Sequence, residues 1–245
     1  MRDFLLEFGR RRAEVRRYLA VLLLAERRLG GGPDRRHEEE LKIFRAGALL
    51  IVYNAVEASA RLGILAIYDE ISRTGTSFDD LRESFRVRVL NDFKNVGAAK
   101  YANLRAIAID LIYSGFDPEK VFPGNVDARK VREAAQTYGF SSDTEYNVTK
   151  NGADLLTVKN RRQHLAHGTH SFSDVGKEYS TEDVARIARH SLAYMSAILL
   201  HIDSYLDLEG YRERPSSPPE SPAPPVKPSW LQRVRGWCVQ WLRQA

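Results

Sequence analysis

The feature that most constrains the fold is one long apolar stretch in the first third of the chain. The sequence GALLIVYNAVEASARLGILAIY, residues 47–68, is apolar almost throughout, and the helical pattern continues on both sides of it. This periodicity predicts a helix over residues 38–72. A helix that is apolar on most of its sides is buried among other elements. The sequence therefore predicts a bundle of helices built around this segment.

The rest of the chain also reads as helical. Apolar residues recur at helical spacing from residue 4 to residue 29, and GGGPD at 30–34 ends that pattern. Ser77 is expected to cap one later helix, and Ser180 with Asp183 resembles a capping box that opens another. We find no convincing pair of strands, so the expected class is all-α. Further helices are predicted over residues 77–92, 99–113, 126–138, 148–166 and 181–206, with breaks at 114–125, 138–143 and 168–176.

The composition changes abruptly after Arg214. Residues 215–228, PSSPPESPAPPVKP, hold seven prolines and predict an extended linker. Residues 229–245 place all three tryptophans on one helical stripe opposite arginines, which predicts an amphipathic helical tail. That tail either packs on its own domain, docks on a partner protein or lies on a membrane surface. The domain organisation is thus a helical domain over residues 1–214, the linker and the tail.

The basic charge of the chain is concentrated at its two ends. Residues 1–36 hold ten Lys or Arg against five Asp or Glu, and residues 215–245 hold four against one. The body between them, with 23 against 26, is slightly acidic. Net charge alone therefore does not predict RNA binding, and such a prediction has to come from a local site.

The sequence also bears on the cellular compartment. Cys238 is the single cysteine, which excludes an internal disulfide and a zinc site built on several thiolates. The apolar run at residues 18–25 is far shorter than the roughly 20 residues that span a bilayer, so no transmembrane helix is expected. Charged residues follow that run where a signal peptide would be cleaved. We expect a cytoplasmic protein.

The densest group of reactive side chains is RRQHLAHGTH, residues 161–170. In one interpretation Arg161, Arg162 and His164 only complement the negative end of a helix that Gly168 stops. In a second, His164, His167 and His170 bind a metal, although Gly168 interrupts their helical spacing. In a third, the segment acts on a phosphodiester without a metal. That chemistry needs a group with a near-neutral pKa and a permanent cation, which His167 and Arg162 supply. A two-fold dimer would bring a second histidine to the opposite side of the reacting phosphate.

Arg162 and His167, within RQHLAHG, resemble the R-x(4–6)-H motif of the HEPN superfamily, and Arg161 also fits its spacing. The core stretch LLIVYNAVEASARLGILAIYDEI and the segment FPGNVDARKVREAAQTYGF are similar to the MAE-type prokaryotic branch. The resemblance covers about residues 38–206 and implies a compact HEPN-like helical bundle. It also implies that a polar residue of a neighbouring core helix faces the motif, and Glu57 and Asn54 are the candidates. Two departures are Gln163, where many motifs have Asn, and Thr169, where nucleotidylated toxins carry tyrosine.

The resemblance implies a function as well as a fold. Many HEPN domains are metal-independent endoribonucleases that leave a cyclic phosphate, which predicts a homodimer that acts on RNA with no cofactor and no metal. Arg162 and His167 are then the catalytic residues, and Arg161, Gln163, His164, Glu57 and Asn54 support them. The setting implied is a prokaryotic toxin or phage-defence system, with an inhibitor or trigger protein. The alternative is a HEPN-like module that dimerises and binds a nucleotide or partner without cutting.

Overall fold

The computed structural model describes residues 1–29, 35–94, 116–117, 121–122 and 124–213. Every regular element in this part of the chain is a helix, which confirms the predicted all-α class. The helix expected over residues 99–113, the proline-rich linker and the amphipathic tail lie outside the described residues. The helices are α1 (Asp3–Leu29), α2 (Arg35–Thr74), η1 (Phe78–Asp80), α3 (Glu83–Lys94), α6 (Ala128–Tyr138), α7 (Tyr146–Thr149), η3 (Lys150–Gly152), α8 (Ala153–Ala166), α9 (Phe172–Gly176) and α10 (Thr181–Asp207).

The chain divides into two compact units. The first unit consists of residues 1–66, 117–135 and 142–199, and the second consists of residues 67–116, 136–141 and 200–245. The helices α2 and α10 each begin in the first unit and end in the second. All the residues that the sequence singles out as a candidate site belong to the first unit.

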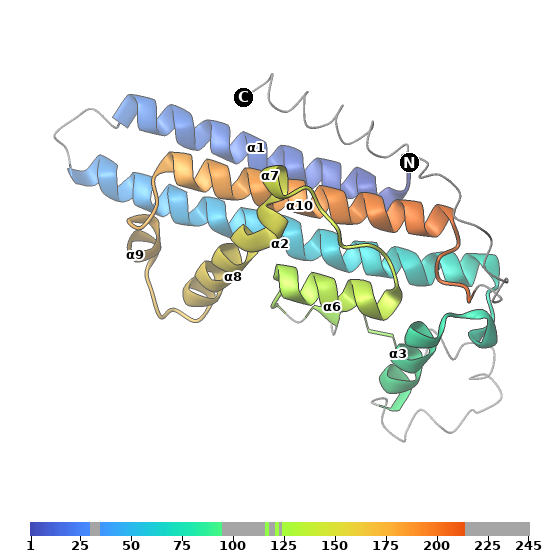
Figure 1. Cartoon of the computed structure of the whole chain (residues 1–245). Helices are drawn as coiled ribbons and strands as arrows, with labels where there is room; N and C mark the ends of the chain where they lie inside the picture. The colour runs from blue at the N-terminus through green and yellow to red at the C-terminus, as the bar shows by residue number, and fades with distance from the viewer. Residues whose placement is uncertain (30–34, 95–115, 118–120, 123, 214–245) are drawn as a thin grey trace. The chain divides into compact units, whose positions relative to one another are not determined.

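In the first unit α1, α2 and α10 run side by side (Figure 1). Arg45 of α2 joins the three helices, because its guanidinium lies 3.2 Å from Glu26 of α1 and donates to Thr181 of α10 at 3.3 Å. Tyr18 of α1 donates to the carbonyl of Phe44 at 3.2 Å. These polar contacts fix the register of three helices whose apolar faces form the core.

The predicted core helix is confirmed as α2, with bounds slightly wider than the sequence indicates. Leu49, Val52, Tyr53 and Ile67 along it are fully buried. The stretch His37–Thr74 is also long and apolar enough to cross a membrane by length and composition, and half of its most apolar window is buried within the protein. The core helix of a globular protein passes the same test, and this burial is what the bundle prediction requires.

Two predicted helices are interrupted. The prediction over residues 148–166 is wrong at its start, because Lys150 and Asn151 adopt left-handed backbone angles between α7 and α8. The prediction of one helix over residues 77–92 is also wrong near its start, for a different reason. After η1 the backbone of Leu81 becomes extended and pairs with Arg212, within the second unit. Ser77 makes no side-chain cap there and donates to Asp80 instead, at 2.8 Å.

A short helix, α9, lies within residues 168–176, which the sequence predicts as a break. Ser171 and Asp174 form a reciprocal capping box at its start. Its end packs closely on α2, since a Cβ on Gly176 would lie 1.8 Å from the carbonyl oxygen of Lys42. The glycine is therefore what lets α9 approach the backbone of the core helix.

In the second unit, aromatic side chains form the core. Tyr68 stacks on Phe116 with ring centroids 3.6 Å apart, and Phe85 packs edge-on to Tyr138 at 5.1 Å. Tyr205 of α10 donates a short hydrogen bond to the carbonyl of Tyr138. These residues come from the end of α2, from α3, from the end of α6 and from the end of α10, apart from Phe116, which lies outside the helices.

Candidate functional site

The candidate motif lies at the carboxyl end of α8, where Gly168 ends the helix as predicted. Its φ is +65°, in the left-handed region that favours glycine. The N–H of Gly168 donates to Leu165, and the N–H of Thr169 donates back to the carbonyl of His164, at 3.1 Å. These bonds form a Schellman motif, and they place His167 at the C-cap of the helix.

Arg162 is held against the core helix. Its guanidinium carbon lies 5.2 Å from the ring centroid of Tyr53, which is a cation–π geometry. Its Nη1 donates to the carbonyl of Gly124 at the long distance of 3.5 Å. Burial raises the pKa of Tyr53 above its ordinary value, so its ring is a neutral support at physiological pH. Arg162 is therefore positioned while its charge stays free of a direct carboxylate partner within the described residues.

Glu57 acts on Arg162 through the backbone of Gly124. Its Oε1 accepts the N–H of Gly124 at 3.0 Å, and the same oxygen receives Arg61 at 2.7 Å. The hydroxyl of Tyr53 accepts the N–H of Val126 at 3.3 Å. Residues 124–126, the Gly124 segment, are thus fixed to α2 at two points. Glu57 thus reaches Arg162 only through Gly124, and its expected role in a site stays a prediction.

Asn54, the other polar candidate on α2, does not join the group. Its side chain is exposed and makes no hydrogen bond within the described part of the chain. The reason is helical geometry: Tyr53 and Glu57 are four residues apart and share one face of α2, whereas Asn54 is turned away from Tyr53 by about 100°. The face that meets the Gly124 segment is therefore that of Tyr53 and Glu57.

Arg161 is placed differently from Arg162, although both fit the motif by spacing. Its Nε donates to the hydroxyl of Tyr179 at 2.7 Å, and its Nη2 lies 2.6 Å from Glu178. Both partners follow α9. Arg161 thus ties the end of α8 to the segment beyond α9, and its charge is already neutralised by a carboxylate.

Gln163 and Lys159 contact the segment that leads into α6. Gln163 donates to the side-chain oxygen of Asn125 at 3.4 Å. Lys159 forms an ion pair with Asp127 at 2.6 Å, and Asp127 also accepts the N–H of Lys130, so it caps α6. The longer amide of Gln163 therefore serves to connect α8 with residue 125.

The histidines of the motif separate into a pair and a single side chain. His164 and His170 pack edge to face with ring centroids 4.4 Å apart, and the hydroxyl of Thr169 lies within 3.3 Å of both rings' Nδ1 atoms. His167 is exposed, and its imidazole makes no hydrogen bond to another described residue. Among the described residues no group of three or more His, Cys, Asp or Glu is arranged to hold a metal ion.

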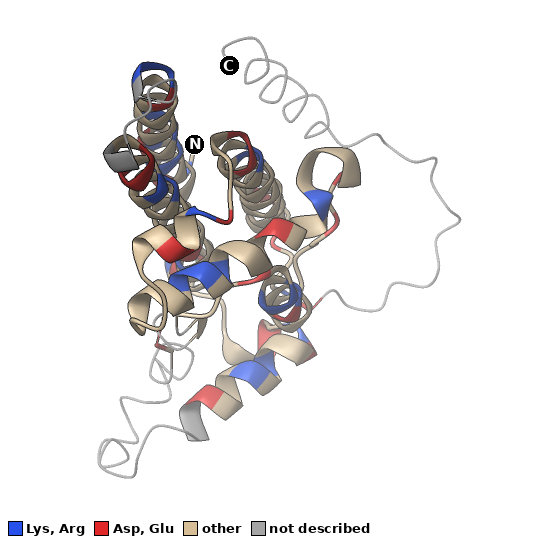
Figure 2. Ribbon diagram, turned by 90° about the vertical axis from the view of Figure 1, so that its left-hand side faces the viewer, with Lys and Arg blue, Asp and Glu red and all other residues tan. Residues whose placement is uncertain are grey.

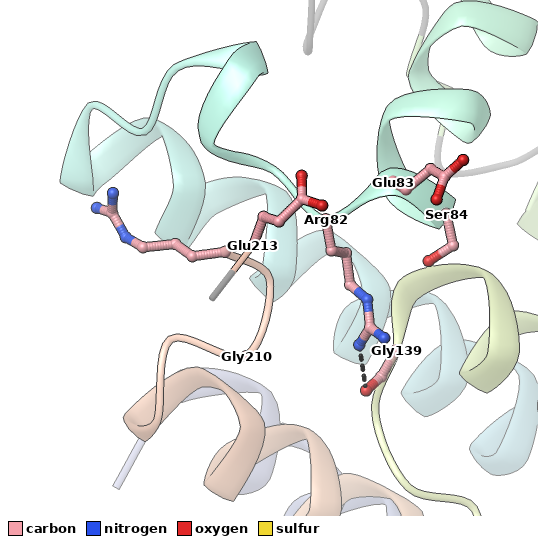
Figure 3. A pocket seen from close by; sticks show the side chains of 7 residues that line it. Arg82, Glu83, Ser84, Gly139, Gly210 and Glu213 are labelled. Atoms are coloured by element: carbon pink, nitrogen blue, oxygen red, sulfur yellow. Dashed lines mark hydrogen bonds between the residues drawn. The ribbon is translucent and has the colours of Figure 1, made fainter. Parts of the chain in front are cut away.

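Positive and negative residues are interspersed along the described helices. In the view of Figure 2, Lys and Arg lie among Asp and Glu on the helices. A separate hollow of about 600 Å³ lies in the second unit and contains two arginines and two glutamates (Figure 3). Its Arg82 donates to the carbonyl of Gly139 at 3.0 Å, and Arg212 pairs with Glu209 at 2.8 Å. These cations are therefore engaged within the protein.

The sequence analysis does not identify the part played by Tyr53. The residue is fully buried, and its ring also supports Arg162. The signal that was available is the four-residue spacing of Tyr53 and Glu57 on one helical face. Gly124 has a φ of +63°, and its place beside Arg162 depends on a contact between residues 38 positions apart.

Comparison with known protein families gives a match over most of the chain. The family model described as MAE_28990-like HEPN matches residues 4–211, which is most of the chain. No curated protein matches the chain. No solved structure matches it either.

Proposed function

The chain belongs to the MAE_28990-like HEPN family, and from this premise we propose that it is a metal-independent endoribonuclease. The observation that carries the proposal is the contrast between Arg162 and His167. Arg162 is fixed on Tyr53 and Gly124 without a carboxylate partner of its own among the described residues, and His167 is exposed on a helix end whose geometry is set. A positioned cation and an accessible imidazole are the two groups that phosphodiester transfer requires.

The proposed reaction is attack of a ribose 2′-hydroxyl on the adjacent phosphorus. His167 takes the proton from the 2′-hydroxyl or gives one to the departing 5′-oxygen, and the new P–O2′ bond forms as the P–O5′ bond breaks. Arg162 stabilises the negative charge that develops on the phosphoryl oxygens. The products are a 2′,3′-cyclic phosphate and a 5′-hydroxyl, so DNA is not cut.

We propose that two copies of the chain complete one site. His167 is five positions after Arg162, with four residues between them, so on a continued helix their side chains would point about 140° apart. Within the described residues no contact joins the two side chains. A two-fold dimer that brings one His167 to each side of the phosphate supplies both the acid and the base from a single motif.

Cleavage of total cellular RNA by the purified full chain in EDTA tests the proposal. We expect cutting in the chelator that is lost, by about a hundredfold or more, in Arg162→Gln and in His167→Ala. The matched controls are His170→Ala, which removes an imidazole from the same segment, and Arg161→Gln, which removes the neighbouring guanidinium. Cutting that requires added metal, or that survives both site variants, contradicts the proposal.

Dimers that pair a wild-type chain with a His167→Ala chain test the shared site. If one phosphate needs His167 from both copies, the mixed dimer is as inactive as the His167→Ala dimer. Sedimentation analysis of each variant checks that the dimers still form. A mixed dimer that keeps about half of the wild-type activity would show that each protomer carries a centre of its own.

The second candidate function is a HEPN-like module that binds a nucleotide or a partner and does not cut. It is favoured by the ion pairing of the basic residues beside the motif, because Lys159 is paired with Asp127 and Arg161 with Glu178. These cations are then less available to an RNA backbone. Intact, dimeric protein that binds RNA or nucleotide but leaves RNA uncut would support this function.

The biological setting proposed is a prokaryotic toxin or phage-defence system in the cytoplasm. A ribonuclease whose activity is not controlled would harm the cell that makes it, so we propose an inhibitor or trigger protein. The tail over residues 229–245 is proposed to recruit the domain to a partner or a membrane surface. Overexpression of the full chain without other proteins tests the need for such a regulator. Growth arrest that depends on His167 supports the regulator, and unimpaired growth of cells that hold active protein contradicts it.

A further inference from the structure

Helix α1 has two faces of opposite character. Phe8, Val15 and Leu22 lie on one face and are each 1% exposed, so this face is packed in the core of the first unit. The opposite face, between residues 6 and 28, points away from that core along about 33 Å of helix. The positions within about 60° of the direction of Leu24 form this outward face of α1.

Large apolar side chains are exposed on the outward face. The exposed fractions are 43% for Leu6, 58% for Val21 and 50% for Leu24. A single exposed aliphatic residue is ordinary on a protein surface, but Val21 and Leu24 are three positions apart and are therefore adjacent on the helix. Leu6 lies about five turns earlier in the same direction. The outward face thus offers apolar contacts near both ends of the helix.

The charges of the outward face have a single sign. Its four arginines, all of them exposed, are Arg10, Arg17, Arg27 and Arg28. Arg10 lies 3.5 Å from Glu7, and 81% of its side chain is exposed. The other three arginines form no ion pair with a described residue.

The acidic residues of α1 between residues 6 and 28 lie outside the outward face. Glu26 lies 3.2 Å from Arg45 of α2, on the inner side of the helix. Glu7 lies 3.1 Å from Arg11, so its charge is compensated. Glu14 is turned about 80° from the middle of the face.

The start of α2 does not neutralise these arginines. Glu38 lies 3.2 Å from Arg45, and Glu39 lies 2.7 Å from Lys42, so both charges are compensated within α2. Glu40 has no ion-pair partner among the described residues, but it belongs to α2 and not to the outward face. The outward face itself is therefore positive.

Cations and aliphatic side chains on one helix face suit an anionic lipid surface. Arginine is attracted to anionic headgroups, and aliphatic side chains enter the boundary between headgroups and acyl chains. A single-stranded nucleic acid is bound instead by aromatic side chains on which its bases stack. The outward face has no aromatic residue. Its composition therefore favours a membrane over a nucleic acid.

We propose that the outward face of α1 binds an anionic lipid surface. The helix lies flat on the bilayer, with its arginines against the headgroups and with Val21 and Leu24 at the boundary of the acyl chains. The inner face stays packed in the first unit, so binding requires no unfolding. The motif residues take no part, and the proposal does not depend on the ribonuclease activity.

Flotation of the full chain with lipid vesicles tests the proposal. Vesicles of phosphatidylcholine with about 30% phosphatidylserine are compared with vesicles of phosphatidylcholine alone. We expect binding to the anionic vesicles and much weaker binding to the neutral ones. Binding should be lost at about 1 M salt, where charges are screened beyond about 3 Å.

The charge of the outward face is tested by the double variant Arg17→Gln with Arg28→Gln. Each arginine near an anionic surface strengthens binding about fivefold, so the double variant should bind about twentyfold more weakly. The matched control is Arg129→Gln with Arg186→Gln. It removes the same charge from exposed positions of α6 and α10 and should leave vesicle binding unchanged.

The apolar part of the outward face is tested by Val21→Ser with Leu24→Ser, which does not change the charge. We expect vesicle binding about tenfold weaker, because the aliphatic side chains no longer enter the lipid boundary. Leu156→Ser, at a side chain of α8 that is 51% exposed, is the control and should bind as the wild type does. Because all these side chains are exposed, thermal unfolding followed by circular dichroism should be the same in each variant.

Equal binding by the wild type and both double variants overturns the proposal, as does the absence of binding to anionic vesicles. Without vesicle binding, arginine-dependent binding of a 2′-O-methyl RNA, which the proposed reaction cannot cut, assigns the face to a nucleic acid. Without vesicle binding, a sedimentation coefficient that falls in the serine variant assigns the face to a second copy of the chain. Vesicle binding by a protein that does not cut RNA supports the lipid surface and contradicts the proposed function alone.

Discussion

Glu57 accepts the backbone N–H of Gly124 at 3.0 Å, and in this way the core helix α2 is tied to the peptide that faces Arg162. The carbonyl of that glycine points to the guanidinium of Arg162. Glu57 is therefore a positioning residue in the proposed site: it fixes the Gly124 segment, and the Gly124 segment fixes Arg162.

Replacing Glu57 with alanine should lower both stability and the proposed cleavage. The part-buried N–H of Gly124 then keeps only the carbonyl of Phe122 as acceptor, and Arg61 loses its ion pair, so we expect a cost of about 1 kcal/mol in the free energy of unfolding. Glu57→Gln keeps an acceptor oxygen and should recover much of both, which urea denaturation and RNA cleavage assays measure. Glu39→Ala, on the exposed part of the same helix, is the control. Full activity in folded Glu57→Ala would remove Glu57 from the site.

The ring and the hydroxyl of Tyr53 should have separable effects. Tyr53→Phe loses the acceptor for the N–H of Val126 and should destabilise the protein by about 1 kcal/mol, but it keeps the ring beneath Arg162 and the cleavage rate. Tyr53→Leu also removes the cation–π contact and should lower the rate, and because the ring is fully buried it should cost further stability, so the rates are compared where both variants are folded. Equal rates in both variants would show that the ring does not support Arg162.

Substitution of the two arginines of the motif should have opposite effects on stability and on cleavage. Arg161→Gln breaks the contacts with Glu178 and Tyr179 and should reduce the free energy of unfolding by about 1 kcal/mol while cleavage continues. Arg162→Gln should stop cleavage with a smaller change in stability. Chemical denaturation and cleavage assays on the same preparations decide the matter, and the reverse pattern would make Arg161 the motif arginine.

Stability should fall in acid partly because of Asp127. Burial by itself would raise the pKa of this carboxyl, but the hydrogen bonds from Lys159 and from the N–H of Lys130 outweigh burial and lower the pKa below its ordinary value. The stabilisation is therefore complete above the ordinary pKa and is lost as the pH falls through the lower folded value. Urea midpoints measured between about pH 5 and pH 2 should drop less steeply in Asp127→Asn than in the wild type. An equal pH dependence of the urea midpoint in both proteins would contradict this contribution of Asp127.

Two glycines should tolerate alanine very differently. Gly176→Ala places a Cβ 1.8 Å from a backbone oxygen of α2, so we expect a loss of about 3 kcal/mol or more, or failure to fold. Gly168→Ala meets no atom within 4 Å and costs only the left-handed backbone, about 1–2 kcal/mol. Thermal unfolding of both variants compares them directly, and equal losses would refute the close packing of α9 on α2.

Features with a local cause were predictable from the sequence. The core helix follows from its apolar run, and the end of α8 follows from Gly168, whose backbone angle suits the Schellman motif. The capping box at the start of α10 is confirmed, because Ser180 and Asp183 accept each other's N–H groups. In each case the residues that decide the structure are neighbours along the chain.

Features with a distant or unusual cause were not predictable. The left-handed turn at Lys150 and Asn151 has one signal in the sequence, the pair Asn151–Gly152, which is typical of turns, but the helical pattern continues across it and conceals the break. The capping box of α9 is visible in the sequence as Ser171 and Asp174, but the helix is too short to show periodicity. Arg161 and Arg162 are equivalent by spacing, and only partners far along the chain distinguish them.

The exposed imidazole of His167 lies in a segment whose two ends are held together by side-chain contacts. The bonds of Arg161 to Glu178 and Tyr179 connect the chain before the loop with the chain after it, and the Schellman bond from Thr169 closes the loop from within. Much of the conformational freedom that an exposed loop would surrender when it meets a ligand is thus already removed in the free protein. A partner that binds His167 gains affinity from that order, even though the side chain itself has no contact to lose.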